Sequence, residues 1–325
     1  MTAPAPGALQ VRLGTTHGLV LRVTCADGVV LGAVSARLAA LPRDDGQRVD
    51  IRVVIETGQP LAPPPPPWQV VYEGPRGTVF YERGLDQLLV CIAGCSAHVD
   101  PEAGTVRIVA PDADPARAWV VSHALLSLPL QECLRRRGWL GLHAAAAVSP
   151  EGAALLLTGP SGAGKSTTTF LLARAGWRVL ADDTVFLTPA GTVVGWPDEL
   201  DLVAETVTLL PDVGGQLSEP LRAGWPKHAL PLEQSCGAVW LDGVDPVALV
   251  FLSVGAGRPS SLTGLDRHDA VMELLPHMLL TRPDVVRDHV ARLISFVEGR
   301  VVAALRVGVP DTVEPALRGL MSSAG

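Results

Sequence analysis

LLLTGPSGAGKSTTTFLLARAGWRVLADDTVFL, residues 155–187, is the stretch around which the chain is organised. It opens with an apolar run, 155–157, that is typical of a buried strand. Residues 167–175 then have a helical pattern, and Gly176 ends it, because glycine readily adopts the left-handed conformation after a helix. A second apolar run, 179–181, is followed at its carboxyl end by Asp182 and Asp183. The stretch therefore predicts a strand, a glycine-rich loop, a helix and a second strand followed by two acids.

The loop matches in full the phosphate-binding pattern of two glycines spaced for Lys and Ser/Thr. Its glycines let backbone N–H groups turn toward an anion, and the helix N-terminus adds partial positive charge. Lys165 is expected to reach the β- and γ-phosphates, and the Ser166 hydroxyl suits a Mg²⁺ ligand. The chain has only two lysines, so an accidental match is rare. The residues expected to bind the nucleotide are Gly159, Pro160, Ser161, Gly162, Ala163, Gly164, Lys165, Ser166 and Thr167.

The composition argues against a nucleic-acid-binding, a secreted and a membrane-spanning protein. The chain has 325 residues, of which 48% are hydrophobic, and this is enough for two domains or one large one. A net charge of −7 argues against general binding to nucleic-acid phosphates. The N-terminus lacks a signal-peptide pattern, and no apolar run is long enough to span a membrane. Five scattered cysteines fit reduced thiols, so we expect a cytoplasmic protein.

The organisation of the chain indicates two domains. Residues 1–115 are predicted to be a β-rich N-terminal domain, and residues 116–325 a catalytic domain that contains the loop. Partial alternation or turn signals predict strands at 19–25, 51–56, 78–82, 88–93 and 105–109, and a short helix at 35–41. The prolines at 63–67 predict a stiff polyproline loop on the surface. The less favoured alternative is that they are a ligand for a partner domain with an aromatic groove.

The second domain is expected to open with a helix over 115–137, kinked or broken at Pro129. Three arginines at 135–137 complement the carboxyl end of that helix, which explains them without a bound phosphate. Residues 140–157 predict a hairpin that places His143 on the strand beside the phosphate loop. A lone histidine is more often structural than catalytic. Further strands are expected at 238–241, 247–254 and 301–307, and helices at 269–280 and 285–298.

Taken together, these residues resemble the catalytic domain of HPr kinase/phosphorylase and its relatives, P-loop kinases that are related to phosphoenolpyruvate carboxykinase. The resemblance rests on Leu142 to Ala144, on Gly159 to Thr167, and on the run AGWRVLADD at 175–183. The pair of aspartates follows the loop lysine by only 17 residues, whereas most P-loop proteins place the Mg²⁺ acid much further on. The resemblance implies an α/β fold of the HPr kinase/phosphoenolpyruvate carboxykinase type with a β-rich N-terminal domain.

The resemblance also implies roles for individual residues. His143 and Asp182 would be the acid/base pair that activates a serine hydroxyl, with Lys165 at the phosphates, and Asp183 would work with Mg²⁺ beside Ser166. A positioned carboxylate can take the proton of a hydroxyl as a phosphoryl group arrives in line. Lys227 is either the basic residue that relatives use near the phosphates or a solvated loop lysine.

The chain departs from the family in two places. The Glu-Ile-Arg-Gly signature associated with phosphorylase activity is missing, since the stretch after Trp196 reads PDELDL. The N-terminal third does not match the sensor domain of the regulatory enzyme. It is more similar to shorter homologues encoded beside peptide-biosynthesis genes, including lasso-peptide precursor kinases. Relatives form multimers, so the resemblance also allows a homo-oligomer.

The sequence thus predicts an ATP- and Mg²⁺-dependent serine kinase that acts on a peptide or protein hydroxyl, with no nucleic-acid or membrane partner. One alternative is a kinase for a small molecule. The other is an ATP-hydrolysing switch or binding module without a hydroxyl acceptor. A guanine-specific switch is excluded in its usual form, because its base-reading motif needs asparagine and the chain has none.

Overall fold

The computed structural model describes residues 7–13, 18–74, 77–196, 199–203, 206, 227–231, 243–255, 257–275 and 282–324. The chain is a mixed α/β protein with several sheets. It divides into two compact units, Met1–Leu140 with Leu280–Arg287, and Gly141–Leu279 with Asp288–Gly325. The first unit thus reaches Leu140, beyond the boundary at residue 115 that we expected, because two helices after residue 115 pack on its sheet.

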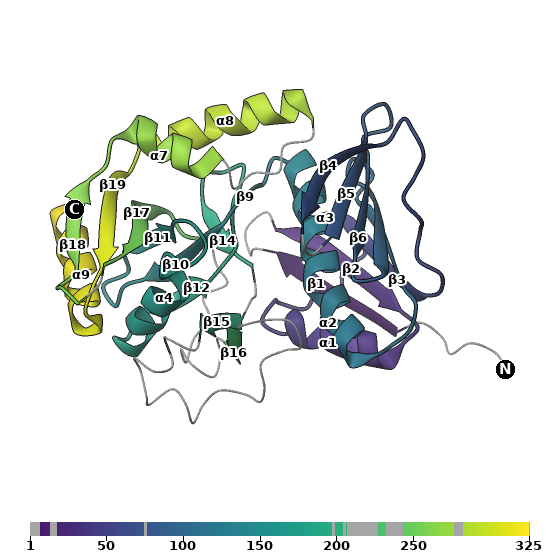
Figure 1. Ribbon diagram of the computed structural model, residues 1–325, viewed down its shortest axis with the longest axis horizontal. Helices are drawn as coiled ribbons and strands as arrows, with labels where there is room; N and C mark the ends of the chain where they lie inside the picture. The colour runs from purple at the N-terminus through teal and green to yellow at the C-terminus, as the bar shows by residue number, and fades with distance from the viewer. Residues whose placement is uncertain are drawn as a thin grey trace. The chain divides into compact units, whose positions relative to one another are not determined.

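The first unit contains an eight-stranded sheet in the order β1-β2-β3-β8-β7-β6-β5-β4 (Figure 1). The β2–β3 and β3–β8 pairs are parallel and the other pairs are antiparallel. All five strands predicted here are present, and three more were missed. The bounds are β1 Gly7–Leu13, β2 Leu19–Cys25, β3 Ile51–Thr57, β4 Gln69–Gly74, β5 Gly77–Glu82, β6 Gln87–Ile92, β7 Cys95–Asp100 and β8 Thr105–Ala110.

Three helices, α1 Gly28–Arg37, α2 Pro115–Ser122 and α3 Ala124–Arg136, form a layer on this sheet. The prediction of a helix at 35–41 was wrong in its bounds. α1 begins earlier because the carboxylate of Asp27 accepts hydrogen bonds from the N–H groups of Val29 and Val30 and so caps the helix.

The break in the helix predicted over 115–137 lies at His123, not at Pro129. His123 has φ −103° and ψ −88°, outside the helical region, and it separates α2 from α3. Pro129 lies inside α3 and is itself buried. The missing N–H of proline is tolerated because the helix is held by its buried side chains, which include Leu125, Leu126 and Leu130.

The three arginines that end this helical segment have partners within the first unit. Arg135 pairs with Glu132, and both side chains are 3% exposed. Arg136 pairs with Asp86, with Nε–Oδ2 and Nη2–Oδ1 distances of 2.9 and 2.6 Å. Arg137 donates to the carbonyl of Cys133, four residues earlier. These contacts agree with the structural explanation of the arginines and assign none of them to a phosphate.

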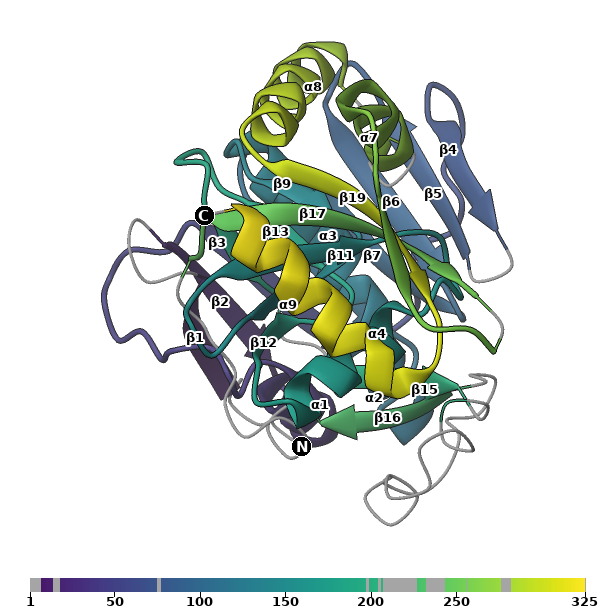
Figure 2. The ribbon, with the colours of Figure 1, turned by 90° about the vertical axis from the view of Figure 1, so that its left-hand side faces the viewer.

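The second unit is built on a six-stranded sheet in the order β12-β10-β11-β17-β19-β18. Helices α4 Lys165–Arg174 and α9 Val313–Ala324 contact each other and lie on one face of it (Figure 2). The Trp177 indole, just after α4, donates to Glu314 of α9 at 3.2 Å. The strands are β10 Ala144–Val148, β11 Ala154–Thr158, β12 Arg178–Ala181, β17 Pro246–Val254, β18 Ser261–Gly264 and β19 Val301–Val307.

Two smaller sheets complete this unit. One has the order β14-β13-β9, with β9 Leu140–Leu142, β13 Val185–Leu187 and β14 Val193–Gly195. The other pairs β15 Glu199–Val203 with β16 Lys227–Pro231. The structure confirms the predicted hairpin, which is formed by β10 and β11. It also confirms the strand after the glycine-rich loop and its helix, which is β12, and the strands predicted at 247–254 and 301–307. The strand expected at 238–241 lies outside the described residues.

The later helices also differ from expectation in their bounds. α7 is Arg267–Leu274 and begins earlier than residue 269 because Asp266 caps it through the His268 N–H. Residues 276–280 lie outside the described part. α8 is Pro283–Glu298, and α9 was missed. None of the described helices combines the length and the apolar character that crossing a bilayer would need.

Candidate active site

The glycine-rich loop joins β11 to α4, and its glycines have the positive φ values that the motif requires. Gly159, Gly162 and Gly164 have φ values of 143°, 82° and 94°, which side chains rarely allow. Gly159 also lies tightly against β17, since a Cβ there would stand 2.8 Å from the carbonyl oxygen of Leu252. The loop is therefore held in its curve by glycines, and at its start by contact with the neighbouring strand.

The first turn of α4 is open to an anion. Gly164 is the N-cap residue, and no side chain caps the helix. The first N–H groups of a helix have no acceptor within the helix, and they carry its positive end. An uncapped N-terminus after three glycines in left-handed conformations fits the phosphates of a nucleotide, the substrate that the motif implies.

Lys165 is the cation of this loop. The residue is only 7% exposed, and its Nζ donates to the carbonyl oxygens of Gly159 and Pro160 at 2.8 and 3.3 Å. Its ammonium group therefore folds back over the start of the loop. A buried ammonium at an uncapped helix N-terminus is the charge that a bound polyphosphate needs.

His143 lies beside the start of the loop because of the register of the hairpin. Ala144 of β10 pairs with Thr158 of β11, and Thr158 directly precedes Gly159. The Thr158 hydroxyl donates to the carbonyl oxygen of His143 at 3.4 Å. The predicted hairpin is present, but His143 lies in the bend between β9 and β10 and not on a strand as we expected.

β10 also pairs with β12 on its other edge, and this brings the two acids to the histidine. The Nδ1 atom of His143 lies 3.1 Å from the carbonyl oxygen of Asp183 and 3.2 Å from its Oδ1. A carbonyl oxygen can only accept, so Nδ1 is the nitrogen that donates a proton in this contact. β10 is thus the strand that joins the loop on one side to the acids on the other.

The two acids differ in exposure. Asp182, directly after β12, is 1% exposed, whereas the side chain of Asp183 is half exposed, at 50%. His143 is 32% exposed, so the histidine and Asp183 are both accessible to a substrate. An exposed carboxylate beside His143 fits a Mg²⁺ ion that keeps several of its waters.

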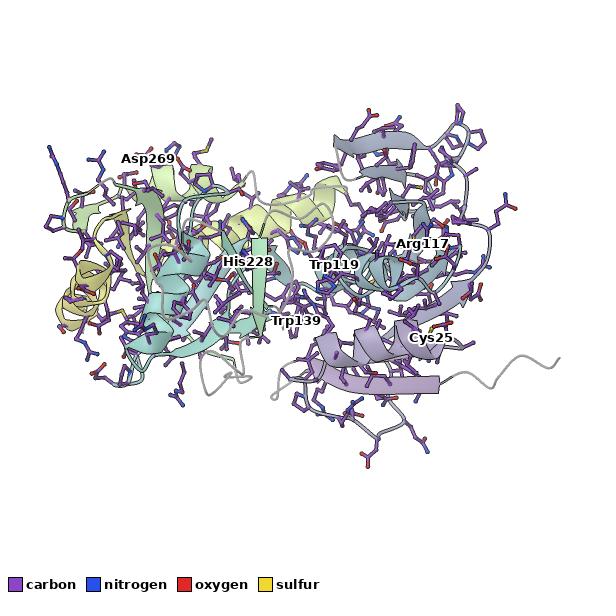
Figure 3. The ribbon with its side chains drawn as sticks, turned by 60° about the horizontal axis from the view of Figure 1, so that its bottom comes forward. Cys25, Arg117, Trp119, Trp139, His228 and Asp269 are labelled. Carbon is purple, nitrogen blue, oxygen red and sulfur yellow. The ribbon has the colours of Figure 1, made fainter. Side chains whose placement is uncertain are left out.

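The hairpin of β15 and β16 covers the helix that follows the loop. Leu200, Leu202 and Leu230 pack with Phe170 of α4. Beyond the end of β15, the Thr206 hydroxyl lies 2.8 Å from that of Thr167 in the first turn of α4. Lys227 begins β16 opposite Val203, and its side chain is outside the described part of the structure. His228, the next residue, is labelled in Figure 3.

Sequence reasoning missed Thr158 and Thr206. Thr158 could have been found from its position directly before the loop, whereas nothing in the sequence indicated that Thr206 would contact Thr167. Another group of potential metal ligands, Asp266, His268 and Asp269, is exposed at the start of α7 (Figure 3 labels Asp269). Helix capping already accounts for Asp266.

Comparison with models of known protein families gives no match for this chain, and comparison with curated proteins gives none either. The resemblance to HPr kinase-like proteins therefore rests on the quoted motifs, and the function has to be argued from the geometry of the site.

Proposed function

We propose that the protein is an ATP- and Mg²⁺-dependent phosphotransferase of the HPr kinase-like P-loop type, a serine kinase that acts on a peptide or protein hydroxyl. One observation carries the proposal. His143 contacts Thr158 at the start of the phosphate loop and also Asp183 after the next strand. An anion-binding loop, a histidine and two acids therefore meet at one end of the second unit's sheet.

Different residues of the chain would bind the phosphates and the Mg²⁺ of the nucleotide. The loop N–H groups and the start of α4 would bind the phosphates, and Lys165 would neutralise charge at the β- and γ-positions. Ser166 and Asp183 would hold Mg²⁺, since a hydroxyl and an exposed carboxylate are hard oxygen ligands. Bound Mg²⁺ would supply charge stabilisation for the phosphoryl group that is transferred.

Asp182 and His143 would activate the acceptor. A carboxylate within hydrogen-bond reach of the acceptor hydroxyl takes its proton, while the oxygen bonds to the γ-phosphorus and the bond to the nucleoside diphosphate breaks. His143, held by Asp183 through Nδ1, would be the second member of the acid/base pair.

Incubation with γ-labelled ATP, Mg²⁺ and candidate peptide acceptors, followed by mass spectrometry, tests this function. The expected product is a peptide that is heavier by one phosphoryl group on a serine. Label that ends only in inorganic phosphate would favour the hydrolysing switch. Label on a small metabolite but on no peptide would favour the small-molecule kinase.

A further inference from the structure

The apolar face of β17 continues past the buried core of the second unit. Ala248, Val250 and Leu252 belong to the core cluster that this strand shares with α4 and α9. Side chains two residues apart lie on the same face of a strand, so Val254 continues that face. Val254, however, is 65% exposed, whereas Leu252 is 3% exposed. The face therefore ends on a valine that the core does not cover.

This valine lies beside the last glycine of the phosphate loop. Gly164 directly precedes α4, and a Cβ there would stand 4.0 Å from Val254 Cγ2 and 3.9 Å from Val307 Cγ2. Val307 is the partner of Val254 in the parallel register of β17 and β19. Two residues earlier, Leu252 borders the first glycine of the loop, Gly159, through its carbonyl oxygen. β17 thus flanks the loop from its start to its end, and the valine at the end is exposed.

Backbone hydrogen bonds hold the segments that follow β17 and β19 together. The N–H of Gly255 donates to the carbonyl oxygen of Val307 at 2.7 Å. The N–H of Val309 donates to the carbonyl oxygen of Arg258 at 2.9 Å. A surface that is already fixed loses little freedom when a ligand packs on it. The end of β17 is therefore a preformed contact surface next to the phosphate loop.

The order of the strands indicates which end of a nucleotide reaches this surface. β11, which precedes the loop, lies between β10 and β17. His143 directly precedes β10, on one side of the loop, and Val254 ends β17 on the other. β10 and β17 are two strand spacings apart, about 10 Å. In the proposed reaction the γ-phosphate lies on the side of His143, so the nucleoside leaves the loop on the side of β17.

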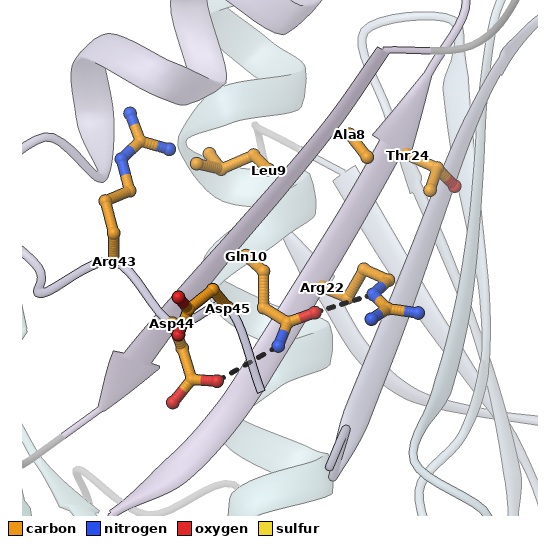
Figure 4. Close-up of a pocket in the computed structure, with 8 residues that line it drawn as sticks. All are labelled: Ala8, Leu9, Gln10, Arg22, Thr24, Arg43, Asp44 and Asp45. Carbon is orange, nitrogen blue, oxygen red and sulfur yellow. Dashed lines mark hydrogen bonds between the residues drawn. The ribbon is translucent and has the colours of Figure 1, made fainter. Parts of the chain in front are cut away.

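The open pocket of the first unit is a poorer place for a base (Figure 4). Most of the residues that line it are polar or charged. The Gln10 amide nitrogen donates to Asp44 Oδ1 at 3.1 Å, and the amide oxygen accepts from Arg22 Nε at 2.7 Å. A base that entered this pocket would compete with hydrogen bonds that are already formed. Val254, in contrast, offers an apolar side chain next to an anion-binding loop.

We propose that the base of the bound nucleotide packs its flat face against Val254. This inference rests on the proposed function, because the γ-phosphate of that reaction fixes the direction of the nucleotide. A nucleotide joins an apolar ring face to a row of phosphates, and the chain places an exposed apolar side chain beside the loop for those phosphates. Packing removes water from both surfaces. Valine has no donor or acceptor, so it contributes affinity for the base without reading its polar edge.

Titration calorimetry of the full chain with two probes tests this contact. One probe is Mg·ATP, and the other is inorganic tripolyphosphate with Mg²⁺, which has three phosphates and no base. Val254→Ser should weaken ATP binding about fivefold, because the base loses its packing on the valine methyl groups. Val254→Phe should tighten ATP binding about threefold, because an aromatic ring stacks on a base. Neither variant should change tripolyphosphate binding by more than twofold, and this also shows that the loop is still folded.

The matched control is Val247→Ser, which should change the affinity for either probe by less than twofold. Val247 is an exposed valine at the other end of the same strand and on its opposite face, about 23 Å from Val254. Unchanged ATP binding in Val254→Ser, or an equal loss for ATP and tripolyphosphate, would overturn the base contact and leave the phosphate site intact. Failure of the parent protein to bind either probe would overturn the proposed function, and the base contact with it.

Discussion

Substitution of Gly159 by alanine probes whether the phosphate loop owes its shape to the contact with β17. Gly159 has a φ of 143°, and a Cβ there would lie 2.8 Å from the Leu252 carbonyl oxygen and 3.1 Å from the Ala163 Cβ. Gly162 is the matched control, because its φ of 82° is also unfavourable for alanine but its Cβ would meet nothing within 4 Å.

The two variants should differ in stability by the cost of that contact. The left-handed backbone costs alanine about 1 kcal/mol at Gly162. At Gly159 the backbone strain and the forced shift from Leu252 together cost about 3 kcal/mol. A domain of roughly this size loses about 2–4 °C of melting temperature per kcal/mol. Gly162→Ala should therefore lower the melting temperature of the second unit by about 3 °C, and Gly159→Ala by about 9 °C.

Differential scanning calorimetry of both variants, with titration of Mg·ATP into each, measures these effects. Gly159→Ala should also weaken nucleotide binding more than Gly162→Ala, because the loop must move away from β17 and its N–H groups lose their alignment. Equal losses of stability in the two variants would refute the claim that close packing against Leu252 sets the loop's path.

Four further substitutions test the proposed catalytic residues and one ion pair of the first unit. Lys165→Ala and Asp182→Asn should each reduce phosphoryl transfer by at least ~10²-fold, about 2.7 kcal/mol of transition-state stabilisation. Asp182→Asn should leave the affinity for ATP largely intact by titration calorimetry; a large loss would reassign Asp182 to the metal. His143→Ala should slow transfer less severely in the same assay, and unchanged turnover would make the histidine structural. Burial alone would raise the pKa of Asp86, but the hydrogen bond and charge of Arg136 outweigh it and hold that pKa below the ordinary 3.8. The stabilisation from ionised Asp86 is therefore present above pH 4 and lost as the pH falls through the lowered pKa. Asp86→Asn should be less stable than the parent at pH 7, and the difference should shrink in acid unfolding curves below pH 4; a constant difference would contradict this.

The parts of the fold that could be predicted are those with local signals. The loop between β11 and α4 is defined by residue types at fixed spacing, and Gly176 marks the end of α4 with a φ of 87°. β2 and β19 have the predicted bounds because their apolar runs are bounded by turn residues. The start of α1 also had a local signal in Asp27, an N-cap residue that the prediction overlooked.

Other features depend on contacts that are distant in sequence. The contact between His143 and Asp183 exists because β10 lies between β11 and β12, and strand order is not encoded in any short pattern. Pro129 was expected to break a helix, but burial of the surrounding leucines outweighs the loss of one hydrogen bond. The contact between Thr167 and Thr206 spans 39 residues and likewise depends on tertiary packing.

Titration calorimetry of Mg·ATP into the parent protein and into Lys165→Ala tests the central claim most directly. We expect one bound nucleotide per chain in the parent protein and at least tenfold weaker binding in the variant, because the ammonium group that would neutralise the phosphates is gone. No binding by the parent, or equal affinity in the two proteins, would contradict it.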